Sequence, residues 1–332
     1  MIRLIVLATG LTAATLVCAQ PSALQNRDQD RDQASESRAN GQIDTADKAD
    51  KTQADTVGQL SIKGIPFQAI TPILGQVEEH PGYTRQIVRV QWRNGDPIDL
   101  FIVKPVGRVL PPVTLFLYSW PGDTDRFFSD AWCRTVTQRG VAAVGFVSAL
   151  TGNRYHDRPW KEWFVSELPE ALTDSVQDVQ MILNYIETRN DLDSSRIGMF
   201  GQGSGGTIAL LAGSVEPRLK AVDVIDPWGD WPNWFATSPV VPASQHEQLN
   251  RLEFLKPLKA LDPFESLPKL GPDRVRVQEV SPNPVNPALV KSALHAAAAG
   301  LTFIEYTTEE DYRHRAMQDG LILSWLTLKL TQ

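Results

Sequence analysis

Cysteine is almost absent from this chain of 332 residues, which contains only Cys18 and Cys133. Cys18 falls in an N-terminal segment that we expect to be removed, so Cys133 would be the only cysteine of the mature protein. An internal disulfide is then excluded, and stability has to come from a hydrophobic core. Cys133 lies in a predicted helix, where we interpret it as a small buried apolar residue.

Positive charge is also scarce. The 32 lysines and arginines are outnumbered by 39 acidic residues, giving a formal net charge of −7. Phosphate binding needs a basic surface, so this composition argues against a nucleic-acid partner. The histidines have no second histidine or carboxylate at metal-ligand spacing, and we therefore expect no metal and no other cofactor. The sequence has no fixed-period repeat and does not predict an oligomeric state.

Long apolar runs are lacking too, and the one at the N-terminus is short for a membrane span. Arg3 supplies a positive n-region, residues 4–17 an apolar h-region, and Val17-Cys18-Ala19 a cleavage site before Gln20. We predict a signal peptide at residues 1–19 and an exported protein, periplasmic or extracellular, with no stable span in the mature chain. A membrane anchor is the alternative. Lipidation of Cys18 is disfavoured because Val17 is larger than the small residue usual before a lipidated cysteine.

Large apolar residues are nearly missing from residues 20–57, which are rich in Gln, Asp, Ala and Arg. Such a segment cannot bury enough surface to fold, so we predict a disordered polar tether. Residues 58–332 are long enough for one large α/β domain.

Within this domain, short apolar runs alternate with segments of helical periodicity. Strands are expected at residues 86–92, 98–103, 113–118, 141–147, 197–200, 220–225, 275–280 and 301–306. Asn94-Gly95 predicts a hairpin turn between the first two strands. Helices are expected at residues 127–138, about 172–186, from 207, 288–299 and 316–330, with an irregular insertion at 226–270. This order predicts an α/β fold with a mostly parallel, twisted sheet of eight strands and helices on both faces.

One stretch, Arg196 to Gly213, has the sequence RIGMFGQGSGGTIALLAG. A buried strand that turns at once into a helix through crowded glycines resembles the nucleophile elbow, G-x-S-x-G, of the α/β-hydrolase family. The register with small residues at both required positions runs from Gly201 to Gly205 and puts Gly203 at the nucleophile position. Placing Ser204 there instead would put Gln202 where a small residue is needed. From the resemblance we expect Gly203 to adopt a strained turn and Ser204 to begin the helix.

The resemblance covers residues 83–330 and is greatest to esterase, dienelactone-hydrolase and prolyl-oligopeptidase-like catalytic domains. It implies a catalytic acid after the seventh strand, where Asn283 stands in place of Asp, or after the sixth, where Asp226 and Asp230 lie. Asp226 can also be read as a turn residue before Pro227. The histidine implied after the eighth strand is His314, for which a solvated basic patch is the alternative.

The resemblance also implies an oxyanion hole of backbone N–H groups. The N–H of Ser204 would be one donor, and Ser119 or Trp120 would supply the other. Six of the nine tryptophans fall on loops at the same end of the strands and suggest an aromatic cleft: Trp120, Trp160, Trp163, Trp228, Trp231 and Trp234. The alternative is that these rings pack the insertion.

Two functions remain open. The first is an acyl hydrolase for an ester or peptide, with Ser204 as displaced nucleophile, His314 as base, and Asp226, Asp230 or Asn283 as orienting group. The second is an inactive relative that binds a small acid, such as a carboxylate, or a partner in the retained oxyanion pocket. Ser119, Trp120, Gly203 and Asn283 are the expected binding residues in either case. A fold alone does not decide between these functions.

Overall fold

The computed structural model describes residues 58–150, 154, 167–318 and 320–332. The predicted signal peptide, residues 1–19, and the predicted tether, residues 20–57, lie outside the described residues.

The described residues form one nine-stranded sheet in the order β1-β2-β3-β5-β4-β6-β7-β8-β9. The strands are β1 (Ile70–His80), β2 (Tyr83–Arg93), β3 (Asp96–Pro105), β4 (Pro112–Leu117), β5 (Ala142–Phe146), β6 (Asp193–Gln202), β7 (Leu219–Ile225), β8 (Val275–Val280) and β9 (Thr302–Tyr306). The first three pair antiparallel with their neighbours, and β4 to β9 pair parallel. The predicted mostly parallel α/β sheet is confirmed.

The strand β1 has no counterpart among the eight predicted strands and adds a ninth at the sheet edge. Almost all of its residues are exposed, including Ile73 and Leu74. A strand buried on neither face shows no alternation between apolar and polar residues, which is why the pattern did not reveal it. The hairpin predicted between the next two strands is present and turns at Gly95, where φ is 70°.

The α-helices are α2 (Asp130–Thr137), α3 (Leu168–Glu187), α4 (Ser204–Val215), α5 (Trp231–Thr237), α6 (His246–Leu249), α7 (Leu252–Leu258), α8 (Leu267–Leu270), α9 (Ala288–Ala297), α10 (Glu309–Tyr312) and α11 (Leu321–Thr331). Short 3-10 helices occupy Asp125–Phe128, Ala243–Gln245, Lys259–Leu261 and Pro263–Glu265, and a π-helix spans Arg313–Gln318.

Two predicted helices are divided in the structure. The segment 127–138 is interrupted at Ser129, whose side chain accepts a hydrogen bond from the Trp132 N–H and so caps α2. The closing segment 316–330 is divided at Gly320, which has a left-handed φ of 66° and precedes α11. In both places a residue that favours a helix boundary overrides the apolar periodicity.

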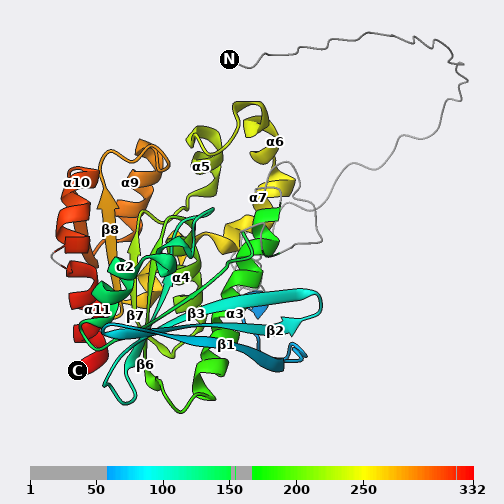
Figure 1. Ribbon diagram of the computed structural model, residues 1–332. Coiled ribbons are helices and arrows are strands. Elements are labelled where there is room, and N and C mark those ends of the chain that lie inside the picture. Colours follow the sequence, from blue (N-terminus) through cyan, green and yellow to red (C-terminus); the bar gives the residue numbers. More distant parts are fainter. Residues whose placement is uncertain (1–57, 151–153, 155–166, 319) are drawn as a thin grey trace, which may run out of the picture. The chain divides into compact units, whose positions relative to one another are not determined.

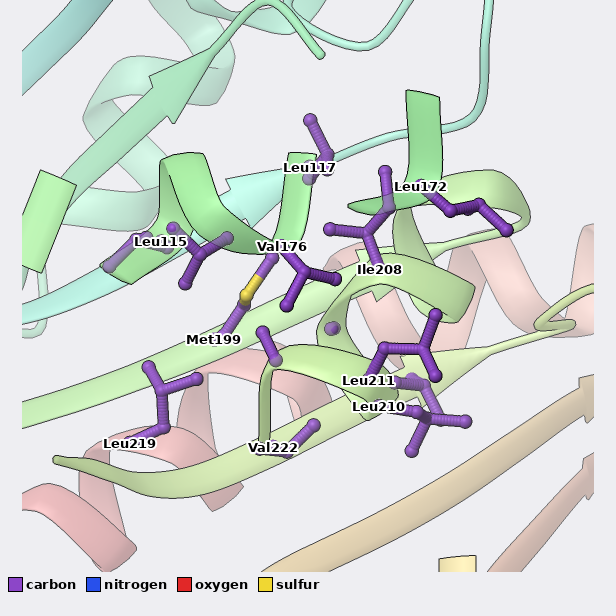
Figure 2. Close-up of a cluster of buried hydrophobic side chains, with 14 of the residues drawn as sticks. Leu115, Leu117, Leu172, Val176, Met199, Ile208, Leu210, Leu211, Leu219 and Val222 are labelled. Carbon is purple, nitrogen blue, oxygen red and sulfur yellow. The ribbon is translucent and has the colours of Figure 1, made fainter. Parts of the chain in front are cut away.

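Helices cover both faces of the sheet (Figure 1). On one face, α3, α4 and α9 pack through Val176, Ile208 and Leu294 in the larger core cluster. Figure 2 shows Val176 and Ile208 there, beside Met199 of β6. On the other face, α2 and α11 contribute the second cluster, which includes Trp132, Val136, Leu326 and the fully buried Cys133. The prediction that Cys133 is a buried apolar residue is confirmed.

Candidate functional site

The turn from β6 into α4, at the sheet's carboxyl edge, has a tightly constrained backbone. Gly203 has φ 55° and ψ −121°, and Ser204 is the first residue of α4, as expected from the sequence. A Cβ on Gly201 would lie 2.3 Å from the Gly205 carbonyl oxygen, and a Cβ on Gly205 would lie 2.1 Å from that of Leu117. Strand and helix can approach this closely only because these positions carry no side chain.

Ser119, in the loop after β4, fills the space beside Gly203. A Cβ built on Gly203 would lie 2.5 Å from Ser119 Oγ and 2.9 Å from Ser119 Cβ. Both distances are shorter than any real contact of a Cβ atom. The hydroxyl of Ser119 therefore occupies the space that a side chain at residue 203 would need.

The Ser204 side chain points toward the same loop. Ser204 is 2% exposed, and its Oγ accepts a hydrogen bond of 2.9 Å from the Trp120 N–H. The Trp120 N–H is, with Ser119, one of the two alternatives expected for the second oxyanion donor. In this structure that donor is bonded to a side chain of the protein.

A pocket of about 260 Å³ opens beyond the carboxyl ends of β6, β7 and β8. It is lined by Ser119, Gln202, Gly203, Asp226, Trp228, Val280, Pro282, Asn283, Pro284, Val285 and Glu309. The loops beyond the carboxyl ends of strands are where ligands bind in open α/β sheets. Four of the expected site residues, Ser119, Gly203, Asp226 and Asn283, come together here.

Asp226 lies directly after β7 with a left-handed φ of 48° and is 7% exposed. One carboxylate oxygen accepts a hydrogen bond of 3.1 Å from the Val280 N–H. Burial raises the pKa of this carboxyl to about 7, against the opposing effects of the Val280 N–H and the Asn283 side chain. Asp226 therefore occupies the turn after β7, in agreement with the turn reading, and it also lines the pocket.

The sequence offered Asp226, Asp230 and Asn283 as alternatives, and two of them line the pocket. Asn283 lines the pocket with Asp226, and its Oδ1 accepts from the Val285 N–H at 2.9 Å. Asp230 is absent from the pocket wall. It stands at the start of α5 and accepts from the Asn233 side chain at 2.7 Å.

His314 is exposed in the π-helix Arg313–Gln318 and is not among the residues that line the pocket. The pocket residue from this part of the chain is Glu309, at the start of α10, whose carboxylate accepts from Arg313 Nε at 3.3 Å. Sequence reasoning missed Glu309, because no motif marks it and its position depends on the turn after β9.

Of the four described tryptophans expected in the aromatic cleft, one lines the pocket. Trp160 and Trp163 lie outside the described residues. Trp228 lines the pocket, whereas Trp231 and Trp234 are buried, 1% and 0% exposed, and pack on one another and on Phe235. Here the alternative is the correct one: these two rings pack the insertion.

No group of three or more His, Cys, Asp or Glu side chains within the described part of the chain could hold a metal ion. Across the same residues, no helix has both the length and the apolar character that crossing a bilayer requires.

The chain matches no family model and no curated protein in sequence. Solved structures resemble it at low identity. An acetyl xylan esterase from a Paenibacillus species is 17% identical with a TM-score of 0.59, covering 82% of this chain and 93% of that one. A glucuronoyl esterase from Solibacter usitatus is 13% identical with a TM-score of 0.54, covering 86% and 94%. An acylaminoacyl peptidase from Pyrococcus horikoshii is 16% identical with a TM-score of 0.58, covering 76% and 42%.

At these identities the similarity concerns the fold, and it agrees with the strand order, the turn at Gly203 and the pocket beyond the strand ends. This chain has the α/β-hydrolase fold.

Proposed function

We propose that this protein binds a small ligand in the pocket between Gly203 and Asn283 and does not form an acyl-serine there. The observation that carries the proposal is the position of Ser119. Its hydroxyl fills the space in which a nucleophile at residue 203 would begin. Gly203 has the backbone of the elbow without the side chain that would perform the chemistry.

The environment of Ser204 supports the same proposal. To act as a displaced nucleophile, Ser204 would have to leave a buried position and give up its hydrogen bond with the Trp120 N–H. A nucleophilic serine also needs a base within hydrogen-bond reach. His314, the base expected from the sequence, does not line the pocket.

Acyl hydrolysis is the second candidate. The elbow backbone is retained, and the similar solved structures include an acetyl xylan esterase, a glucuronoyl esterase and an acylaminoacyl peptidase. In this version Ser204 is the displaced nucleophile, His314 the base, and Asp226 or Asn283 the orienting group, and the substrate is an ester or peptide.

Ester turnover separates the two candidates. We expect the wild-type protein to hydrolyse a chromogenic acetate ester no faster than Ser204→Ala and His314→Ala. Ser214→Ala is a matched control, because Ser214 lies on the same helix and donates to the Leu211 carbonyl. Wild-type turnover that is lost in Ser204→Ala and His314→Ala, and kept in Ser214→Ala, would establish the hydrolase instead.

We further propose that residues 1–19 direct export to the periplasm or the extracellular space and that residues 20–57 act as a tether. Support comes from the charge and apolar pattern of the N-terminus. N-terminal sequencing of the exported protein should begin at Gln20. An exported protein that still begins at Met1, or one that carries a lipid on Cys18, would contradict this proposal.

A further inference from the structure

Among the described residues Asp226 forms no ion pair, in contrast to two other buried carboxylates. Asp223 pairs with Arg276 at 2.6 Å, and Glu279 pairs with Lys291 at 2.8 Å. Buried charges are normally compensated in this way. For Asp226 the structure shows only the Val280 N–H and the Asn283 side chain as partners among the described residues.

Asp262 is a useful comparison, because it is a half-buried carboxyl whose pKa is also raised by burial, to about 6. Its oxygens accept from the backbone N–H groups of Phe264 at 3.0 Å and Trp231 at 3.4 Å. Its role is to hold the insertion, and it is not on the pocket wall. Asp226, by contrast, faces a cavity that a ligand can enter.

The charges near Asp226 largely cancel one another. Lys291 forms an ion pair with Glu279 and donates a hydrogen bond to the Val280 carbonyl oxygen. His295 contacts the same glutamate at 2.9 Å. At the pocket rim, Glu309 pairs with Arg313. Glu279 raises the pKa of Asp226 and Lys291 lowers it, both less than burial does. The carboxylate of Asp226 is left as the uncompensated charge.

The rest of the lining favours a cation and disfavours an anion. Among the described residues that line the pocket there is no lysine, arginine or histidine, and hydrogen-bond acceptors are present on Ser119, Gln202 and Asn283. Pro282, Pro284 and Val285 form an apolar wall. The Trp120 N–H, which was expected to donate to an oxyanion, donates its hydrogen bond to Ser204 Oγ. A carboxylate ligand, which we expected from the sequence, would meet like charge.

We infer that the pocket binds a small molecule with a primary ammonium group, which contacts the Asp226 carboxylate while an apolar body lies against Pro282, Pro284 and Val285. This inference rests on the proposed binding function and specifies its ligand. The volume of about 260 Å³ suits a ligand below drug size.

The inference predicts the sign of the pH dependence. An ammonium group stabilises the ionised carboxyl, so it lowers the pKa of Asp226 from about 7 and releases a proton on binding. An alkylamine stays protonated up to about pH 10, as a lysine side chain does. Amine affinity should therefore rise from pH 5.5 to pH 8 as Asp226 ionises. A carboxylate paired with protonated Asp226 would show the reverse.

The test uses three probes of the same shape with the full chain: cyclohexylamine, cyclohexanol and cyclohexanecarboxylate. At pH 8, calorimetry should show the amine binding about tenfold or more tighter than the alcohol, and the difference should shrink at pH 5.5. Asp226→Asn should remove the preference for the amine, so that the amine and the alcohol bind within about twofold of each other. Asp262→Asn, the matched control, should keep it.

Absence of amine binding, tighter binding of the carboxylate, or an amine preference that survives in Asp226→Asn would overturn the inference. Serine-dependent ester turnover would instead refute the proposed function, and it is measured without any of these probes. The two failures are therefore distinguishable.

Discussion

Gly203 and Ser119 are complementary residues at the elbow, since the side chain absent from one position is replaced by that of the other. We predict that Gly203→Ser is destabilised by roughly 2–4 kcal/mol, because a positive φ costs about 1–3 kcal/mol for a non-glycine residue and the new side chain also meets Ser119. Adding Ser119→Gly should recover the part that is due to the steric clash. Urea denaturation measures both quantities.

Gly95→Ser is the control for backbone strain alone, because Gly95 also has a positive φ, 70°, and open space around it. Two results together would contradict the steric clash. Gly203→Ser would lower the free energy of unfolding no more than Gly95→Ser does, and adding Ser119→Gly would restore none of it.

Asp226 also makes stability depend on pH. Its pKa rises on folding from an ordinary 3.8 to about 7, so between these values the folded state binds more protons than the unfolded state. The protonated Asp226 carboxyl makes its full contribution to the stability of the folded state below pH 3.8. This contribution is lost as the pH rises through about 7. We predict that Asp226→Asn, which avoids this loss, is more stable than wild type at pH 8 by on the order of 2 kcal/mol.

The comparison is made from the free energy of unfolding at pH 5 and pH 8. Asp262 titrates in both proteins, so the difference between them isolates Asp226. Equal pH profiles for wild type and Asp226→Asn would show that this carboxyl is not strained by burial.

Several site residues could be located from sequence because the fold places them. Gly203, Asp226 and Asn283 each end or follow a predicted strand, and parallel strands bring those ends to one edge. Ser119 was expected as an oxyanion donor through its backbone, but its side-chain position beside Gly203 depends on the path of a loop. The exposure of His314 depends on the π-helix in which it lies, and no local sequence pattern predicts that helix.

At the scale of elements, β7 and β8 are joined by a buried ion pair as well as by the parallel ladder. Arg276 donates to both oxygens of Asp223 at 2.9 and 2.6 Å, and Gln278 donates to the same carboxylate at 2.8 Å. Arg276→Met would leave Asp223 buried without its cation. We predict a loss of about 3–5 kcal/mol in unfolding free energy.

The double variant Asp223→Asn/Arg276→Met should recover much of that loss, since the uncompensated charge is gone. Arg251→Met is the surface control, because Arg251 and Glu247 form an exposed pair at 3.7 Å whose loss should cost about 0–1 kcal/mol. A double variant as unstable as Arg276→Met would contradict the role assigned to the charge.

Elements with at least one buried face were predictable from their apolar pattern, and the exposed strand was not. The strand pattern at 275–280 coincides with β8, and α3 contains the predicted apolar face at 172–186. The exposed β1 gave no pattern, and the apolar pattern of the closing helix did not reveal the break at Gly320. Hydrophobic periodicity reports burial, so it describes an element only as far as the element is buried.

At the scale of the whole molecule, the predicted tether should contribute nothing to the core. Residues 20–57 have almost no large apolar side chains, and we predict that deleting them changes the melting temperature by less than about 2 °C. Scanning calorimetry of the two proteins provides the comparison. A substantially lower melting temperature after deletion would show that this segment packs on the domain.

We propose that the α/β-hydrolase fold of this protein holds a binding pocket without a reactive serine. Intact-mass analysis after treatment with a fluorophosphonate, which modifies activated serines, tests it most directly. We predict that the wild-type protein gains no adduct under conditions in which an active serine hydrolase is modified completely. A stoichiometric adduct that maps to Ser204 or Ser119, and disappears when that serine is replaced by alanine, would contradict the claim.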